Sequence, residues 1–134
     1  MEYCHTKTLH GVDFDDAVRR TEEALKGQGF GVLTRIDVRD TLRKKLDVDF
    51  RPYVILGACN PPLAHQALSA ELDIGLLLPC NVVVYAGEEP GQCIVAVMDP
   101  VAALGLTGNQ AIGPIAEEVR GKMERVLKSI GDSP

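Results

Sequence analysis

Three short segments of this chain are apolar at almost every position, and they restrict the fold more than any other feature. They are residues 53–58, 82–85 and 93–98, with the sequences Tyr-Val-Ile-Leu-Gly-Ala, Val-Val-Val-Tyr and Cys-Ile-Val-Ala-Val-Met. Because successive side chains of a strand point to opposite faces, such strands present apolar side chains on both faces of a sheet. Each face must therefore be covered, either by helices on both sides or by helices on one side and a second subunit on the other.

The segments around these strands predict the other elements. Residues 87–91 (Gly-Glu-Glu-Pro-Gly) are short and rich in turn formers, so the strands on either side of them are expected to form an antiparallel hairpin. Asp13, Asn60 and Pro114 each stand at the start of a stretch with apolar residues at helical spacing, which predicts three helices. The expected elements are strands at 2–9, 30–36, 53–58, 81–85 and 92–98, the three helices just described, and a surface helix at 38–46.

This order of elements predicts an α/β (α+β) fold with two layers. The hairpin and the polar first strand favour a mixed, mostly antiparallel sheet with helices packed on one face. The other face would then bear apolar side chains, so we expect a homodimer held mainly by apolar contact. A length of 134 residues predicts a single domain over residues 1–134.

The charge balance argues against a nucleic-acid partner. The chain has a net charge of −5, and its one basic cluster, Arg43-Lys44-Lys45, lies on the expected surface helix. A groove that follows a phosphate backbone needs clustered basic side chains on a wider surface. We therefore interpret this cluster as the solvated side of a helix.

No segment predicts a membrane partner either. The apolar runs, among them Ile74 to Leu78, are all far shorter than the roughly 20 residues that a bilayer requires. The first seven residues lack the basic start and apolar stretch of a signal peptide. A cytoplasmic protein is expected, in which the four cysteines stay reduced.

Several longer sequence words resemble a known family. They are Gly-Phe-Gly-Val-Leu-Thr at 29–34, Tyr-Val-Ile-Leu-Gly-Ala-Cys-Asn-Pro-Pro at 53–62, Ile-Gly-Leu-Leu-Leu-Pro-Cys-Asn-Val-Val-Val-Tyr at 74–85 and Val-Met-Asp-Pro at 97–100. Together they closely resemble the uncharacterised bacterial and archaeal family called domain of unknown function 302, from about Tyr3 to Leu127. This resemblance implies a small α/β fold with a TATA-binding-protein-like arrangement and a dimer, and it implies no agreed activity.

Cys59 is the most interesting single position. It lies between an apolar strand and a helix that Asn60 is expected to begin, and ligands of α/β sheets collect where strands end and helices begin. The positive end of a helix dipole favours a thiolate. Cys80-Asn81 repeats the pair Cys59-Asn60, and both pairs would face one cavity if their strands are antiparallel neighbours. The alternative is that Cys59 is a buried packing residue, while the asparagines serve as a helix cap and a turn.

His65 follows Cys59 by six residues, and the two could share a soft metal such as zinc. The chain lacks the close Cys-x-x-Cys pairs of a structural zinc site, so a surface histidine is the favoured interpretation. Cys4 and His5 would point to opposite faces of a strand and cannot bind one ion together. No metal site is therefore predicted.

Catalytic motifs are missing from the sequence. It contains no phosphate-binding loop, no dinucleotide fingerprint and no Gly-x-Ser-x-Gly elbow. The favoured hypothesis is a dimeric small-ligand-binding module rather than an enzyme, with its cofactor, if any, unknown. Its candidate ligand-binding residues are Cys59, Asn60, Cys80, Asn81 and His65. Two alternatives stay open: a thiol-based redox or metal-handling protein that uses Cys59 and Cys80, and an interaction domain whose apolar sheet face binds another protein.

Overall fold

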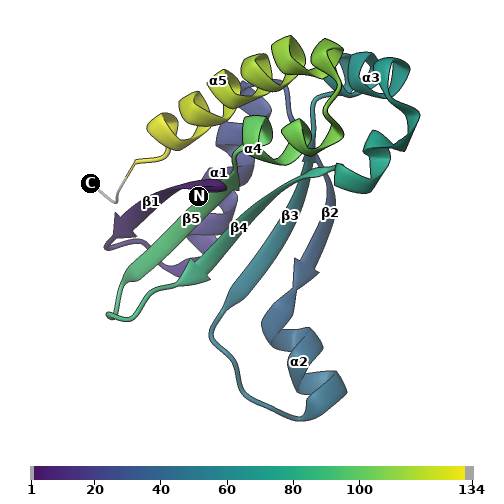
Figure 1. Ribbon diagram of the computed structural model, residues 1–134. Helices are drawn as coiled ribbons and strands as arrows, with labels where there is room; N and C mark the ends of the chain where they lie inside the picture. The colour runs from purple at the N-terminus through teal and green to yellow at the C-terminus, as the bar shows by residue number, and fades with distance from the viewer. Residues whose placement is uncertain (1, 132–134) are drawn as a thin grey trace.

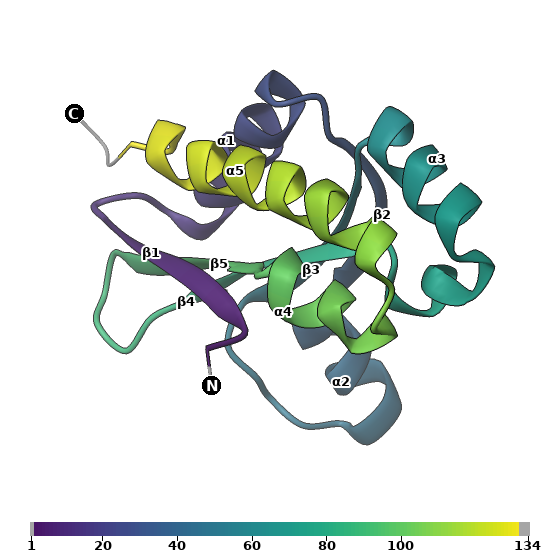
Figure 2. The same ribbon diagram turned by 45° about the horizontal axis from the view of Figure 1, so that its top comes forward.

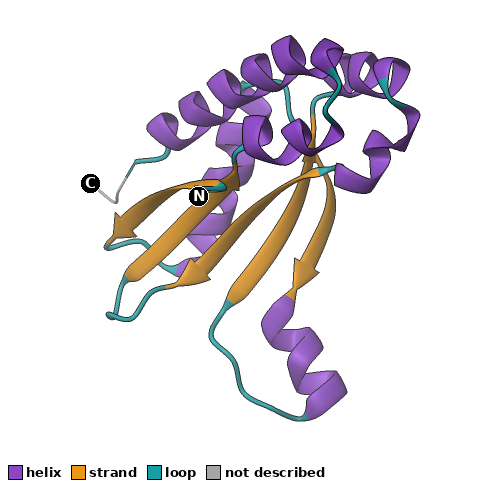
Figure 3. Ribbon diagram, in the orientation of Figure 1, coloured by secondary structure: helices purple, strands orange, loops and turns teal. Residues whose placement is uncertain are grey.

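The computed structural model describes residues 2–131, which form one five-stranded sheet with helices packed along it (Figures 1 and 3). The strands are β1 (Cys4–His10), β2 (Gly31–Asp37), β3 (Tyr53–Cys59), β4 (Cys80–Ala86) and β5 (Gln92–Met98). The helices are α1 (Phe14–Gly27), α2 (Val38–Leu46), α3 (Pro61–Ala70), α4 (Pro100–Leu104) and α5 (Gly113–Ser129), with 3-10 turns η1 (Leu72–Leu77), η2 (Gly105–Thr107) and η3 (Gln110–Ile112).

The strand order is β1-β5-β4-β3-β2, and all four pairings are antiparallel. The predicted α/β fold and the β4–β5 hairpin are confirmed, and the described residues include no parallel pair, so the sheet is not mixed. The reason is visible in Figure 1, where α2 and α3 lie beyond opposite ends of the sheet. A helix at the end of a sheet returns the chain beside the strand it has just left, and the next strand therefore runs antiparallel.

One face of the sheet is covered by α1 and α5. Figure 2 shows α5 lying across the sheet with α1 beside it. The predicted apolar stripe of the last helix is buried there, and Met123 and Val126 have no exposed surface. On the sheet side, the core is built from alternate residues of the strands: Leu9, Val54, Leu56, Ala58, Val82, Val84, Cys93, Val95 and Val97. Within residues 2–131, no helix combines the length and apolar character needed to cross a membrane.

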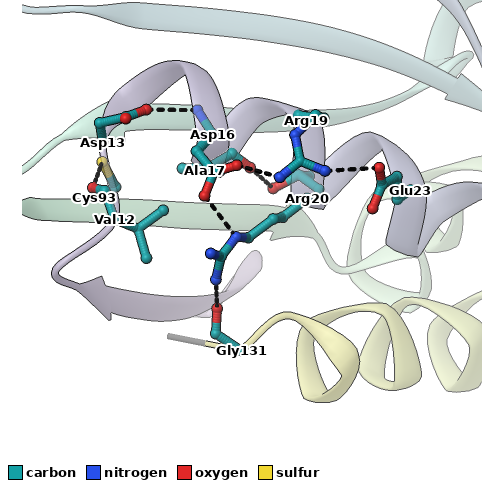
Figure 4. A network of polar contacts seen from close by, with 10 residues as sticks. Val12, Asp13, Asp16, Ala17, Arg19, Arg20, Glu23, Cys93 and Gly131 are labelled. Atoms are coloured by element: carbon teal, nitrogen blue, oxygen red, sulfur yellow. Dashed lines mark hydrogen bonds and ion pairs between the residues drawn. The ribbon is translucent and has the colours of Figure 1, made fainter. Parts of the chain in front are cut away.

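Polar contacts in the first turns of α1 fix this helix against the segment that follows α5 (Figure 4). Asp13 caps the helix, because its carboxylate accepts a hydrogen bond of 2.8 Å from the backbone N–H of Asp16. The carboxylate of Asp16 lies 2.8 Å from the guanidinium of Arg20. Arg20 in turn donates a hydrogen bond of 2.8 Å to the carbonyl of Gly131, which follows α5. These contacts link the two helices that cover the sheet.

A second, smaller core lies beyond the end of the sheet. It is formed by α3, the 3-10 turns, α4 and the beginning of α5, and its buried residues are Ala67, Ile74, Leu104, Ile112 and Ala116. Leu78 and Ile115 pack against both this cluster and the main core. The structure therefore contains a seam between two cores, at the end of the sheet where β3 finishes and β4 begins.

Candidate functional site

A hollow lined almost entirely by apolar side chains lies at this seam. It has a volume of about 270 Å³. The position follows from local sequence signals, because Asn60 and Pro61 begin α3 directly after β3 and so turn the chain away from the sheet. The inner face of α3 then forms one wall, while α5 and Cys80, the first residue of β4, contribute to others. We call this cavity the apolar hollow.

Sixteen residues line the apolar hollow, and none of them carries a charge. Asn60 is the one side chain among them with an amide, and Cys59 and Cys80 contribute thiols. The others are Phe30, Leu33, Ala58, Leu63, Ala64, Ala67, Leu68, Gly75, Leu78, Pro79, Leu104, Ile115 and Val119. A lining of this kind favours apolar ligands, since it offers shape and contact area but few polar partners.

The two candidate cysteines lie on the same hollow. Strands β3 and β4 are antiparallel, and Ala58 pairs with Cys80, so the end of one strand meets the beginning of the other. This antiparallel pairing is the condition under which the two Cys-Asn pairs were expected to lie near one cavity. Burial, and secondarily the nearby Cys59, raise the pKa of the Cys80 thiol to about 11. Cys59 is half-buried and Cys80 is buried, and both are free thiols.

Gly57 lets Pro79 pack close to the sheet beside the hollow. A Cβ atom at Gly57 would lie 2.8 Å from Cγ of Pro79 and would overlap the hydroxyl group of Thr34. Thr34 and Pro79 therefore pack directly against the backbone of Gly57. The absence of a side chain at Gly57 helps to hold Pro79 where it lines the hollow.

Asn60 lines the hollow, but its amide already has partners. Its Oδ1 accepts a hydrogen bond of 3.3 Å from the N–H of Leu63, which is the cap predicted from the sequence. Its Nδ2 donates one of 3.4 Å to the carbonyl of Gln28. The amide therefore stabilises the start of α3.

Asn81 and His65 do not line the hollow. Asn81 lies within β4 rather than in a turn, is exposed, and pairs with Gly57. His65 is exposed on α3. The structure thus brings Cys59, Asn60 and Cys80 together and leaves the other two candidates outside, while a role of any of the five in ligand binding stays a prediction.

The arrangement offers no cluster of metal ligands. Among residues 2–131, no three His, Cys, Asp or Glu side chains gather in a way that could hold a metal ion. Cys59 and Cys80 line the hollow without a histidine or a carboxylate beside them. A metal centre built on the two thiols would lack protein ligands for a closed tetrahedral site.

Sequence reasoning missed most of the lining. Leu104, Ile115 and Val119 come from α4 and α5, where the sequence indicated no candidate site residue. The available signal was the apolar run Ile74 to Leu78, which is too apolar for an exposed connection. Ile74 is buried in the second core, and Leu78 lines the hollow.

Asp99 positions α4, whose last residue, Leu104, lines the hollow. Its Oδ1 accepts hydrogen bonds from the N–H groups of Val101 and Ala102, at 2.9 and 3.4 Å, and its Oδ2 lies 3.0 Å from Nε2 of His5. Burial alone would raise the pKa of Asp99, but these backbone N–H groups and the imidazole outweigh it. The pKa of this carboxyl therefore lies below its ordinary value.

This lowered pKa predicts a loss of stability in acid. A carboxyl group whose pKa is depressed by folding stabilises the fold above its unfolded pKa, and that contribution disappears as the pH falls through the folded value. The loss attributable to Asp99 is thus expected below about pH 4. Urea unfolding from pH 7 to pH 2.5 should show a smaller acid-induced loss in Asp99→Asn, which keeps a capping oxygen without the charge, than in the wild type. Parallel pH curves for the two proteins would contradict this expectation.

The fold and the site together define a small two-layer α/β protein with an apolar hollow at one end of its sheet. The chain matches the model of the family described as domain of unknown function DUF302 over residues 5–130, and it belongs to that family. It is also similar to a solved structure, the uncharacterized conserved protein DUF302 from Bacillus stearothermophilus, with a TM-score of 0.87 and 31% sequence identity over 97% of this chain and 99% of the other. No curated protein matches the chain. The predicted family is confirmed.

Proposed function

We propose that this protein binds a small, neutral, apolar ligand in the apolar hollow. The observation that carries this proposal is a cavity of about 270 Å³ without a charged lining residue. A dry cavity of about 150 Å³ lined by aliphatic and aromatic side chains is large enough to bind benzene. The hollow therefore suits a ligand somewhat larger than a single aromatic ring.

The polar groups of the lining support a neutral ligand. The Asn60 amide is engaged at both ends by backbone partners, and the thiols of Cys59 and Cys80 are weak hydrogen-bond donors. A charged ligand would lose its hydration on entering the hollow without gaining a paired charge, at a cost of several kcal/mol. Affinity would come mainly from buried apolar area.

Exposed apolar side chains mark a way into the hollow. Leu33 and Leu68 line it and are nevertheless 67% and 36% exposed. Gly75 also lines it, and a Cβ there would meet only Cδ2 of Leu68, at 3.9 Å. Apolar side chains that face water at the rim of a cavity gain burial when a ligand enters, which favours binding.

Binding of neutral aromatic probes tests the proposal. Toluene and indole should bind, as measured by calorimetry, and should raise the midpoint of thermal unfolding, because a ligand that binds only the folded state stabilises it by mass action. Benzoate, which resembles toluene in size but carries a charge, should bind at least about tenfold more weakly. Failure of both neutral probes to bind at millimolar concentration would contradict the proposal.

Filling the hollow should abolish this binding. Ala64→Leu adds three carbon atoms to a half-buried position in the lining of the hollow, and we expect affinity for indole to fall at least about tenfold. Ala70→Leu is the matched control, since it makes the same change at an exposed position of the same helix outside the lining. Equal affinity of the two variants would place the bound probe elsewhere.

A thiol-based activity is the second candidate. It is favoured by one observation, the position of Cys59 and Cys80 on the same hollow. The raised pKa of Cys80 opposes it, because a thiolate rather than a thiol is the nucleophile in redox chemistry. The neutral-ligand proposal needs no ionised thiol and fits the hollow better.

A further inference from the structure

The face of the sheet opposite α1 and α5 is covered by no helix of the described residues. In Figure 1 this face is turned toward the viewer, with α1 behind the strands. Residues directly opposite each other in an antiparallel pair share a face. The strand pairings thus place one row of side chains across the middle of this face, in the order Ile36, Ile55, Val83, Ala96 and Thr6.

A second row carries an aromatic cluster. Tyr53 pairs with Tyr85, and their rings stack with centroids 5.2 Å apart. Phe50 lies 6.2 Å from the Tyr53 ring and extends the surface beyond the sheet, with 41% of its own surface exposed. The chain has six Phe and Tyr residues in total, so half of them gather here. Aromatic side chains in solvent-facing clusters are typical of interfaces.

No charged side chain points to this face from the strands. Charged residues make up 25% of the chain, yet those of β1 and of the middle of β2 point to the helices. Lys7 donates to the carbonyl of Leu127 at the end of α5, and Arg35 lies 3.1 Å from Glu22 of α1. The positions on the open face are Cys4, Thr6, Thr8, His10, Gly31, Thr34, Ile36, Tyr53, Ile55, Gly57, Cys59, Asn81, Val83, Tyr85, Gln92, Ile94, Ala96 and Met98.

The area of this face is close to the area that a stable dimer buries on each partner. Five strands of seven residues span roughly 24 Å by 23 Å at ordinary strand spacing and rise. The flat area is thus on the order of 550 Å², before the relief of the side chains and the adjoining Phe50 are added. A stable interface buries about 800 Å² on each partner. The open face approaches that area once the relief of its side chains and Phe50 are counted.

We propose that this face binds the same face of a second copy of the chain, which makes the protein a homodimer with a sheet-on-sheet interface. Each copy has a net charge of −5, and an uncharged contact surface lets two such copies meet without burying like charges. Complementary charges often select a different partner, and the strands offer none on this surface. Closed two-fold dimers are also the commonest soluble assemblies.

Sedimentation velocity between 1 and 100 µM, with variants that place a carboxylate on the face, tests the proposal. The wild type should sediment as a dimer. Val83→Glu changes the centre of the middle row, and it should weaken association by at least about 100-fold, since each dimer would bury two unpaired carboxylates. Circular dichroism should show native secondary structure in the resulting monomer.

Two further variants keep the test decisive. Thr6→Glu changes an exposed residue of the same row, so it should dissociate the dimer without disturbing the core, even where Val83→Glu fails to fold. Gln66→Glu introduces the same charge at an exposed position of α3 and should leave the dimer intact. A wild type that is monomeric at 100 µM, a Thr6→Glu variant that stays dimeric, or a control that dissociates equally would each overturn the proposal.

Discussion

Replacing Leu56 by alanine is expected to lower the free energy of unfolding by about 2–5 kcal/mol. Leu56 has no exposed surface and lies in the core between β3 and the helix layer. Its removal therefore costs both the transfer of the lost methyl groups and the cavity left behind. Urea denaturation at 25 °C measures the loss, with the slope of the transition unchanged if only stability is affected.

Ile55 is the matched control for this prediction, because it is the neighbour of Leu56 in β3 and points to the opposite face. It is only half-buried within one chain, so Ile55→Ala should cost about 1 kcal/mol when unfolding is measured at sub-micromolar protein concentration. The penalty should grow with protein concentration, since this side chain lies in the proposed interface between copies. Equal losses for the two variants at low concentration would contradict a core confined to one face of the sheet.

Cys80 should be alkylated about 100-fold more slowly in the folded protein than in urea at pH 8. The thiolate is the reactive form, and a pKa of about 11 leaves only about a thousandth of this thiol ionised at pH 8, compared with about a tenth or more in an unfolded chain. Iodoacetamide labelling followed by mass spectrometry of the peptides measures each cysteine separately. Rapid labelling of folded Cys80 at pH 8 would remove the main argument against thiol chemistry.

The same raised pKa predicts a loss of stability in alkali. Below about pH 8 the Cys80 thiol is largely protonated in both the folded and the unfolded state, so its contribution to stability is present. Between about pH 9 and pH 11 the unfolded chain ionises first, and the free energy of unfolding should fall by about 2–3 kcal/mol. Cys80→Val, which keeps a buried apolar side chain of similar size, should lack this part of the decline.

Local patterns in the sequence were sufficient to predict most elements. Alternation and runs of β-branched residues identified the five strands, and Asn60 with Pro61 identified the start of α3, because these signals depend only on neighbouring residues. The short helix α4 was missed. It depends on Asp99, whose capping contacts are local, but whose side chain also contacts His5 from the other end of the sequence.

The candidate site could be predicted only in part. The repeated Cys-Asn pairs drew attention to Cys59 and Cys80, and both line the apolar hollow. His65 and Asn81 lie outside it, because the direction of a side chain on α3 and the register of β4 against β3 depend on tertiary packing. Neither the direction of that side chain nor the strand register follows from the spacing of residues in the sequence.

The sequence by itself determined the types of the main elements, the two-layer class of the fold and the membership of its family, since these follow from periodicity, caps and long sequence words. Tertiary structure alone decided that all strands run antiparallel, that Ala58 faces Cys80, and that residues as distant as Leu33 and Val119 enclose one hollow. Register and cavities depend on contacts between segments far apart in the chain. The free energy of such contacts depends on shape complementarity between whole surfaces, which no local pattern encodes.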